Sequence, residues 1–308
     1  MGNDIPILEF SKTPSEDPLW TTFMGHLVHP DYSHPVFFRH NLSNVNLFNI
    51  YAGETVYLIG RGPSLGRFVE NAKINKMLQH PVITTYGMNS SPEVLNNNVN
   101  LWSAVDNVTK FPRQIAKNPN ITKFIPMNRF TTFDFNSRTQ DNKKILAYKD
   151  GEEMKYNCLC PNMFGVQTYL LSKDSVRSVT FGNAFLNCPA VLYGMFKGHK
   201  CVLLYAIKIC LLLGFKKIVL VGVDFSMDPK EPYYKQTAAD HNSFHVQHNN
   251  RLYDALAPMM QEIVSTLHKN KSQYRCKIST AEKIPLLPFI PKVDLAAQLA
   301  ADIARKTK

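Results

Sequence analysis

The sequence predicts a doubly wound α/β fold, in which helices cover both faces of a mainly parallel sheet. Two observations predict it. Short apolar runs recur along the chain, and each ends at Gly, Asn or Asp before a polar turn or a helical segment. This recurrence is typical of a parallel sheet. In addition, the near-continuous β-branched run 217–222 follows a long apolar segment that ends at Gly214, as expected for a buried strand after its crossover helix.

The elements follow in order from these runs and from their turn residues. Strands are expected at 55–59, 80–86, 99–105, 121–126 and 217–222, and helices at 65–77, 198–213 and 244–268. The domain organisation predicted from them is an irregular N-terminal extension (1–50), a nucleotide-binding domain (51–290) and a basic C-terminal helix (291–308). The polar, aromatic stretch 128–160 is an insertion, which is either lid-like or a surface loop.

Composition narrows the class of protein. The 308 residues are 44% hydrophobic and 19% charged, which is ordinary for a globular protein. The sequence contains no uninterrupted apolar run of about 18 residues, so no membrane span is expected. The start lacks a signal-peptide pattern, and the six cysteines are scattered, so a reducing cytoplasm is expected. The pair Cys158-Leu-Cys160 is a weak metal signal.

The net charge of +11 favours polyanionic partners. Phosphorylated ligands, nucleic acid and an anionic membrane surface all qualify, and the last would place the protein peripherally at the inner membrane surface. The alternative is a solvated basic face that keeps the protein soluble. Much of the excess charge lies in the C-terminal part of the chain, from Lys269 onward.

Small and polar residues follow four of the expected strands. They are Gly60-Arg-Gly-Pro-Ser64, Gly87-Met-Asn-Ser-Ser91, Asp106-Asn107 and Gly222-Val-Asp-Phe-Ser226. Ligands of doubly wound sheets bind beyond the carboxyl ends of the strands. The four ends are therefore expected to meet at one rim and to form a binding site there.

The first of these turns predicts a phosphate site. Gly60 and Gly62 permit unusual backbone angles and close approach to a ligand, while Pro63 and Ser64 are suited to start and cap a helix. Free N–H groups of that helix would then face an anion. The turn is neither a G-x-G-x-x-G motif nor a Walker A loop. The alternative is a tight strand-to-helix turn that needs glycines for geometry alone.

Other polar residues are weaker candidates. Asp224 is placed to orient a ribose or substrate hydroxyl, or else to cap a helix or pair with a base, and Asn89 and Asp106 have the same alternatives. Gly198-His199-Lys200 opens the apolar helix and is expected either to contact phosphate or to be a solvated helix start.

Three histidines share one expected helical face, at positions 241, 245 and 248. Neutral imidazole near pH 7 can take a proton from an acceptor hydroxyl, so one reading is a general base. A metal site and a surface helix with incidental histidines are the alternatives.

Three motifs together resemble a known superfamily. They are Ile59-Gly-Arg-Gly-Pro-Ser-Leu65, Thr85-Tyr-Gly-Met-Asn89 and Leu212-Leu-Gly-Phe-Lys-Lys-Ile-Val-Leu-Val-Gly-Val-Asp-Phe225. The chain is similar in these to the bacterial family forty-two sialyltransferases, the motility accessory factors and the archaeal 6-hydroxymethylpterin pyrophosphokinases. The resemblance covers roughly residues 55–265 and implies a Rossmann-like domain that holds a nucleotide on the first turn.

The resemblance also implies residue roles. The donor of the sialyltransferases is a CMP-sugar, and the positions that match its contacts are Gly60, Arg61, Gly62, Pro63, Ser64, Asn89, Asp106, Asn107, Gly198 and His199. The general base matches His248 by spacing, with His245 next. Of the two tyrosines that hold the leaving phosphate, the first is replaced by Ser226, and Tyr233 or Tyr234 matches the second.

The expected function is therefore a glycosyltransferase with a nucleotide-sugar donor, a histidine general base and Asp224 in the catalytic centre, and with no required metal. The acceptor would be a glycan, a glycolipid or nucleic acid. One alternative is a pyrophosphokinase-like enzyme that uses ATP and Mg²⁺, held by Asp106 and Asp224. Another is a non-catalytic nucleotide- or nucleic-acid-binding protein that uses the basic stretch 128–160.

Overall fold

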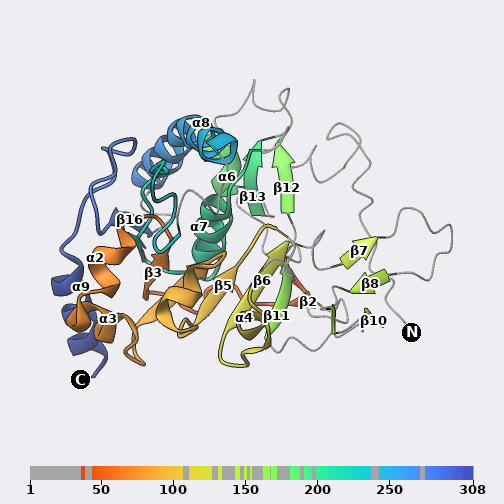
Figure 1. The fold of residues 1–308 in the computed structure, drawn as a ribbon, viewed down its shortest axis with the longest axis horizontal. Coiled ribbons are helices and arrows are strands. Elements are labelled where there is room, and N and C mark those ends of the chain that lie inside the picture. The colour runs from red at the N-terminus through yellow and green to blue at the C-terminus, as the bar shows by residue number, and fades with distance from the viewer. Residues whose placement is uncertain are drawn as a thin grey trace.

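A computed structural model confirms the doubly wound α/β fold (Figure 1). It describes residues 36–38, 44–106, 111–126, 131–133, 143–145, 149–150, 153–154, 162–166, 168–171, 181–187, 191–195, 199–236, 243–270 and 275–307. The predicted N-terminal extension (1–50) and the predicted insertion (128–160) are each described only in part, within these ranges.

Nine strands form the main sheet. Their order is β16 (Lys277–Thr280), β15 (Lys217–Val221), β3 (Thr55–Ile59), β4 (Thr84–Met88), β5 (Leu101–Ser103), β6 (Thr122–Pro126), β11 (Met163–Val166), β1 (Phe37–Phe38) and β2 (Asn44–Val45). The strands from β16 to β11 run parallel, and β1 and β2 are antiparallel at one edge. The predicted extension 1–50 thus supplies two strands of the sheet.

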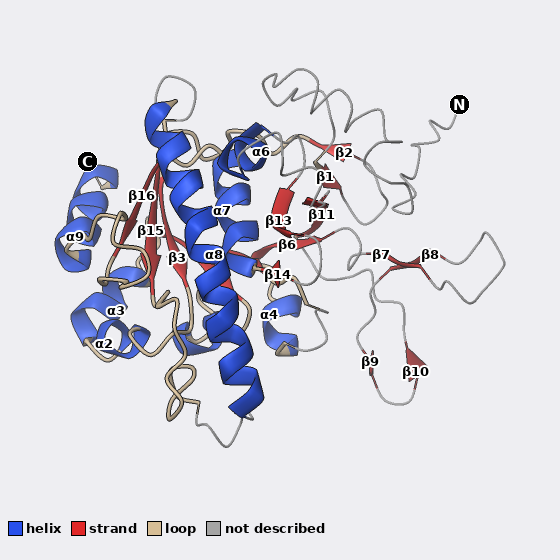
Figure 2. Cartoon of the chain, turned by 90° about the horizontal axis from the view of Figure 1, so that it is seen from above, coloured by secondary structure: helices blue, strands red, loops and turns tan. Residues whose placement is uncertain are grey.

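Helices cover both faces of this sheet. On one face lie α2 (Leu65–Val69), α3 (Ala72–Leu78), α4 (Arg113–Lys117) and α9 (Leu295–Lys306), and on the other α6 (Phe181–Asn187), α7 (Val202–Leu212) and α8 (Ser243–Lys269). Figure 2 shows β16, β15 and β3 between the two helical layers. Strand side chains alternate accordingly: Val56 and Leu58 pack with α7, whereas Tyr57 and Ile59 pack with α2 and α9.

Smaller elements lie outside the main sheet. A short 3₁₀ helix spans Ser91–Leu95, and β12 (Thr168–Leu171), β13 (Val191–Met195) and β14 (His199–Lys200) form a three-stranded sheet. Strand β7 (Thr131–Phe133) pairs with β8 (Lys143–Ile145), and β9 (Lys149–Asp150) with β10 (Glu153–Met154). These two pairs fall within the predicted insertion 128–160 and stand apart from the main sheet in both views (Figures 1 and 2).

Two predicted helices differ from the observed ones. The helix predicted at 65–77 is broken into α2 and α3, because Asn71 leaves the helical conformation and its side chain caps α3 by accepting from the N–H groups of Lys73 and Ile74. The helix predicted to open at 198 begins at Val202, since His199 and Lys200 pair with β13 as a strand.

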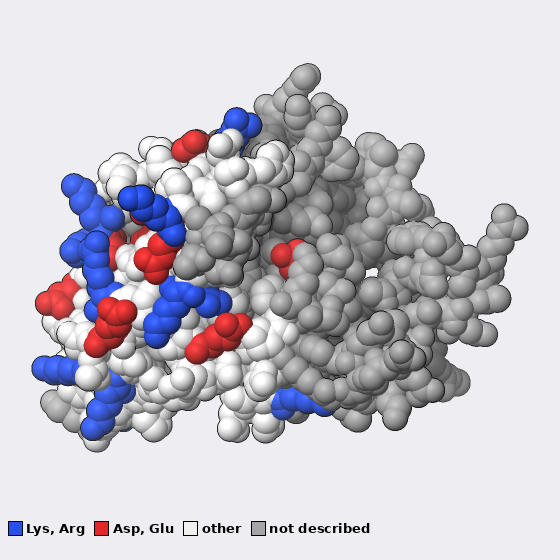
Figure 3. Space-filling view, viewed as in Figure 1, with Lys and Arg blue, Asp and Glu red and all other residues white. Residues whose placement is uncertain are grey.

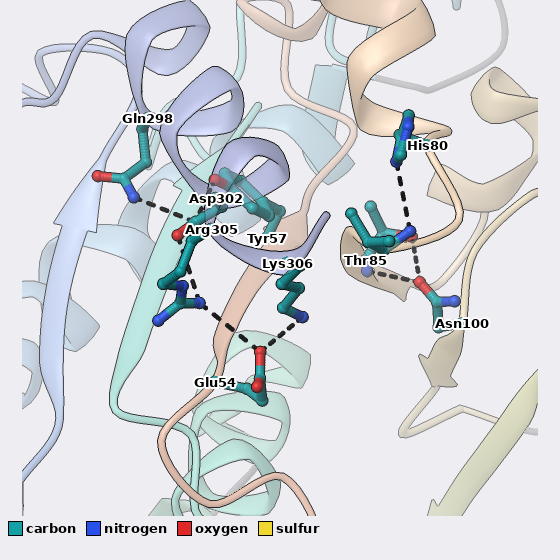
Figure 4. A network of polar contacts seen from close by, with 10 residues as sticks. Glu54, Tyr57, His80, Thr85, Asn100, Gln298, Asp302, Arg305 and Lys306 are labelled. Carbon is teal, nitrogen blue, oxygen red and sulfur yellow. Dashed lines mark hydrogen bonds and ion pairs between the residues drawn. The ribbon is translucent and has the colours of Figure 1, made fainter. Parts of the chain in front are cut away.

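The basic C-terminal helix predicted at 291–308 is α9, and a buried polar contact fixes it to the sheet (Figure 4). The Tyr57 hydroxyl donates to Asp302 Oδ2 over 2.8 Å, and Gln298 Nε2 donates to the same oxygen over 3.1 Å. Arg305 approaches the other carboxylate oxygen to 3.5 Å. Burial and the neighbouring Asp302 carboxylate raise the pKa of Tyr57. The buried carboxylate of Asp302 in α9 thus receives a hydrogen bond from Tyr57 in β3.

Tyr57→Phe is expected to lower the free energy of unfolding by about 1.5–3 kcal/mol, because a buried carboxylate loses a donor. Denaturant unfolding measures the loss. Since the pKa of Tyr57 is raised in the folded state, its contribution is present below about pH 10 and is lost as the pH rises further, so the difference between variant and wild type should shrink there. Tyr51→Phe is the control, because the Tyr51 ring stacks on Phe215 at another place in the core. Equal losses for both variants would contradict the role of Asp302.

Candidate functional site

A cavity of about 410 Å³ opens where four parallel strands end. Its wall includes residues that follow β3, β4, β5 and β15, at the carboxyl edge of the sheet. The strand order reverses between β3 and β15. Strands β4, β5, β6 and β11 lie on one side of β3, whereas β15 and β16 lie on its other side. The cavity therefore lies at the topological switch point, where ligands of this fold class bind. The prediction that the four ends meet at one rim is confirmed.

The turns after β3 and β15 interlock through their backbones. Gly60 N–H donates to Val221 O and Gly62 N–H to Gly222 O, both over 2.8 Å. A Cβ on Gly60 would lie 2.3 Å from Gly222 O, and one on Gly62 would lie 2.2 Å from Asp224 Oδ2. Both glycines are thus required by contacts within the chain itself. A tight strand-to-helix turn that needs glycines for its geometry alone is therefore sufficient to explain both of them.

Asp224 occupies the position at which a phosphate was expected. Its Oδ2 accepts from the Ser64 backbone N–H over 3.0 Å, and the residue also lines the cavity. Ser64 stands at the predicted N-cap position of α2, but its side chain makes no capping bond, and its buried hydroxyl has no partner within the described part of the chain. Helix α2 has five residues, and Pro63 and Ser64 do not line the cavity. The hydrogen-bonding capacity of the Ser64 backbone N–H is therefore already used by a side chain of the same protein.

The turn after β15 is strained beside the cavity. Phe225 has a φ of 53°, a left-handed conformation that is unfavourable for a bulky residue and costs on the order of 1–3 kcal/mol. Its ring is buried and lies 5.5 Å from the Tyr253 ring of α8. Such strain persists where the surroundings impose it, and it is found preferentially at functional sites.

Arg61 is the cation among the cavity-lining side chains described here. Its guanidinium lies 3.2 Å from Glu93 Oε2 and donates from Nε to Tyr234 O over 3.3 Å. The side chain is 16% exposed. Arg61 is thus held at the rim by a carboxylate, and an anion in the cavity would compete with Glu93 for it.

The adjacent tyrosines predicted as alternatives have different surroundings. Tyr233 lines the cavity and is hydrogen-bonded to Tyr253, and burial raises the pKa of both phenols. Tyr234 is buried away from the cavity against Gly66. Its hydroxyl donates to Glu70 Oε1 over 2.8 Å, and burial together with that carboxylate raises its pKa to about 12. Tyr233 is therefore the candidate, and its protonated phenol can donate at neutral pH.

Asn89 presents an unpaired acceptor at the end of β4. Its backbone is left-handed, with a φ of 51°, and is held by Trp102 Nε1, which donates to Asn89 O over 2.7 Å. The amide oxygen Oδ1 is buried and has no partner within the described residues, although Asn89 lines the cavity. A buried acceptor without a donor is costly, so a donor on a ligand would relieve it.

The amino end of α7 also reaches the cavity. Cys201, Val202 and Leu203 line it, and Cys201 is the N-cap residue of this 11-residue helix. The positive end of the helix macrodipole therefore points to the cavity. Burial raises the pKa of the Cys201 thiol, which keeps it neutral. Of the segment predicted to contact phosphate, Gly198 lies outside the described residues, and His199 lies in β14, its side chain undescribed.

The two candidate bases lie on the first turns of α8. His248 is exposed and outside the cavity wall, and its ring stacks on Phe244 with centroids 6.1 Å apart. His245 lies one helical turn before Asn249, which lines the cavity, but its side chain is outside the described structure. His248 is therefore not part of the cavity wall, and the role of His245 stays a prediction.

Asp106 lines the cavity after β5 and is exposed, while Asn107 lies outside the described residues. Cavity residues that the sequence reasoning missed are Asn249, Leu252 and Tyr253 of α8. A signal for them was present: Leu252 and Leu256 follow each other at helical spacing, and this apolar row predicts which face of the helix turns inward.

Two further observations concern the described residues alone. They contain no group of three or more His, Cys, Asp and Glu side chains arranged to hold a metal ion. Among their helices, none combines the length and the apolar character needed to cross a bilayer. Cys158 and Cys160, which are a weak metal signal in the sequence, lie outside the described residues.

Comparison with known proteins adds no further assignment, since no protein-family model, curated protein or solved structure matches this chain.

Proposed function

We propose that this chain is a glycosyltransferase that moves a sugar from a nucleotide-activated donor, of the CMP-sugar type, to an acceptor hydroxyl. The observation that carries the proposal is the cavity at the switch point, with four strand ends and the amino end of α7 in its wall. Its volume of about 410 Å³ lies within the usual range of small-ligand sites.

Three groups suit the nucleotide part of the donor. The unpaired Oδ1 of Asn89 can accept from an amino or hydroxyl group. The positive end of α7 and the guanidinium of Arg61 favour a phosphate in the same cavity. Asp224 is already bonded to the turn after β3, so its role would be to keep that turn in place and to orient a hydroxyl with its remaining acceptor capacity.

The tyrosines suit the leaving phosphate. In a direct displacement the acceptor oxygen bonds to the anomeric carbon while the bond from that carbon to the phosphate oxygen breaks, and the electron pair stays on the phosphate. The Tyr253 hydroxyl donates to Tyr233, and protonated Tyr233 can donate to this developing charge. Because burial raises both pKa values, the donors stay protonated throughout the neutral range.

A histidine suits the proton of the acceptor. His245 on α8 would take it, since its position is one turn from the cavity wall. The acceptor glycan, glycolipid or nucleic acid would enter on that side of the cavity.

A second function is favoured by one observation. Asp106 and Asp224 line the same cavity, and Mg²⁺ is commonly held by one or two carboxylates plus substrate phosphates. An ATP- and Mg²⁺-dependent pyrophosphokinase-like enzyme would use them in this way. A thermal-shift panel of CMP, UDP, GDP and ATP, each with and without Mg²⁺, separates the two functions. Stabilisation by CMP without Mg²⁺ is expected, and stabilisation by ATP that requires Mg²⁺ and is lost in Asp106→Asn would favour the second.

Tyr233→Phe is expected to lower the turnover for donor hydrolysis by roughly 10²-fold, because it removes a donor to the leaving phosphate. Tyr253→Phe is expected to lower it less, because it removes only the hydroxyl that donates to Tyr233. Hydrolysis of CMP-, UDP- and GDP-sugars measures this without a known acceptor. Tyr234→Phe is a matched control, since its hydroxyl bonds Glu70 outside the cavity. That variant should lose stability and keep its turnover. An equal loss in all three variants would mean that the effect is structural.

His245→Ala is expected to lose roughly 10²–10⁴-fold in turnover, with little change in donor affinity, because the base acts on the attacking oxygen. Neutral imidazole is the active form, so activity falls as the pH drops through its pKa. The acidic limb of the pH-rate profile should therefore disappear in the variant. His248→Ala is the control, as its ring is exposed and outside the cavity wall. Wild-type turnover in His245→Ala would remove the histidine mechanism.

A further inference from the structure

Basic side chains gather at the edge of the sheet opposite to the cavity. Lys217 and Lys277 are register partners at the amino ends of β15 and β16, and Lys277 N–H donates to Lys216 O over 2.9 Å. Arg275 precedes the same strand by two residues. Arg305 and Lys306 arrive there at the end of α9, where both approach Glu54, the residue before β3. We call these residues the amino-edge face: Lys216, Lys217, Arg275, Lys277, Arg305 and Lys306.

Few carboxylates offset this charge. Glu54 lies 2.5 Å from Lys306 Nζ and 3.7 Å from Arg305, and the buried Asp302 is shared by Tyr57, Gln298 and Arg305. Lys216, Arg275 and Lys277 are exposed and form no ion pair within the described part of the chain. Arg305 and Lys306 also complement the α9 macrodipole. Figure 3 shows Lys and Arg side chains, with acidic ones between them, over the end of the molecule that carries α9.

An exposed aliphatic side chain stands beside this charge. Ile50 is 54% exposed and is one of three large hydrophobic residues that the described structure leaves exposed. Its loop is fixed to the amino edge, because Asn49 N–H donates to Leu212 O and Tyr51 N–H donates to Leu213 O, over 3.0 and 2.8 Å. Glu54 O in turn accepts from Lys216 N–H over 2.9 Å. Ile50 therefore projects from the same edge as the cations.

We propose that the amino-edge face binds the surface of an anionic phospholipid bilayer, with Ile50 entering the headgroup region. Cations near such a surface each contribute about 1 kcal/mol of attraction, and an adjacent apolar side chain adds burial that a nucleic acid backbone does not reward. This combination is the reason to favour a lipid surface over nucleic acid. The parallel strands then place the cavity at the far edge, about 16 Å away for a five-residue strand, so that it opens toward the aqueous phase.

Vesicle co-sedimentation of the full chain tests the proposal. The probes are phosphatidylcholine vesicles alone and vesicles with about one third phosphatidylglycerol, at low salt and at roughly 0.5 M NaCl. Binding is expected only to the anionic vesicles at low salt. Lys216→Glu with Lys277→Glu should lower the partition coefficient at least tenfold, since two attractive charges become repulsive. The double variant Lys230→Glu with Lys283→Glu is the matched control, because both residues are exposed and follow β15 and β16 at the carboxyl edge.

Ile50→Ala separates insertion from simple attraction and should lower the partition coefficient several-fold at unchanged salt dependence. An unchanged coefficient would overturn the insertion of Ile50. Equal losses in the two charge-reversal variants would overturn the assignment to the amino-edge face, because net charge alone would then explain binding. A 30-base-pair DNA duplex that binds the wild type, with no binding to anionic vesicles, would overturn the lipid partner. Thermal melts of each variant exclude unfolding, and nucleotide binding at the cavity is measured separately.

Discussion

The close contact between the turns after β3 and β15 is the constraint on which the site depends. Gly60 N–H donates to Val221 O at the end of β15, Gly62 N–H donates to Gly222 O in the turn that follows, and neither glycine has room for a Cβ. Gly222, with a φ of 66°, completes the contact from the other side. Since β3 and β15 pair along their whole length and flank the switch point, the two turns start side by side where the cavity opens. Asp224 then bonds the Ser64 amide and holds the two turns together.

This arrangement changes the meaning of the glycine-rich turn. A G-x-G-P-S-L turn suggests phosphate binding, because glycines let a ligand approach the backbone. Here the space that a Cβ on Gly62 would need is taken by a carboxylate oxygen of the same chain. The helix whose amino end lines the cavity is instead α7, from Cys201 to Leu203. In the proposed function, phosphate would thus be held by the amino end of α7 and by Arg61, with the first turn as a rigid wall.

The sequence was sufficient for features that depend on strand ends and insufficient for those that depend on side-chain direction. Strand order along the chain and the polar residues after each strand predict the rim, because parallel strands end at one edge. Whether Tyr233 or Tyr234 faces the cavity depends on a local β-bridge between Tyr233 and Gln236, which no periodic pattern reveals. Tyr253 comes from α8, far along the chain, so its contact with Tyr233 required the folded structure.

The tyrosine pair also bears on how the site is built. Phe225 is held in a left-handed conformation, and its ring packs on Tyr253, so the strained turn after β15 also positions a phenol of α8. Tyr233 reaches the same phenol from the following loop. Three segments therefore meet at the hydrogen bond that Tyr253 donates to Tyr233 in the cavity wall. Strain in the turn is balanced by this packing, so relief of the strain would come at the expense of the position of Tyr253, and with it of the hydrogen bond that Tyr253 donates to Tyr233.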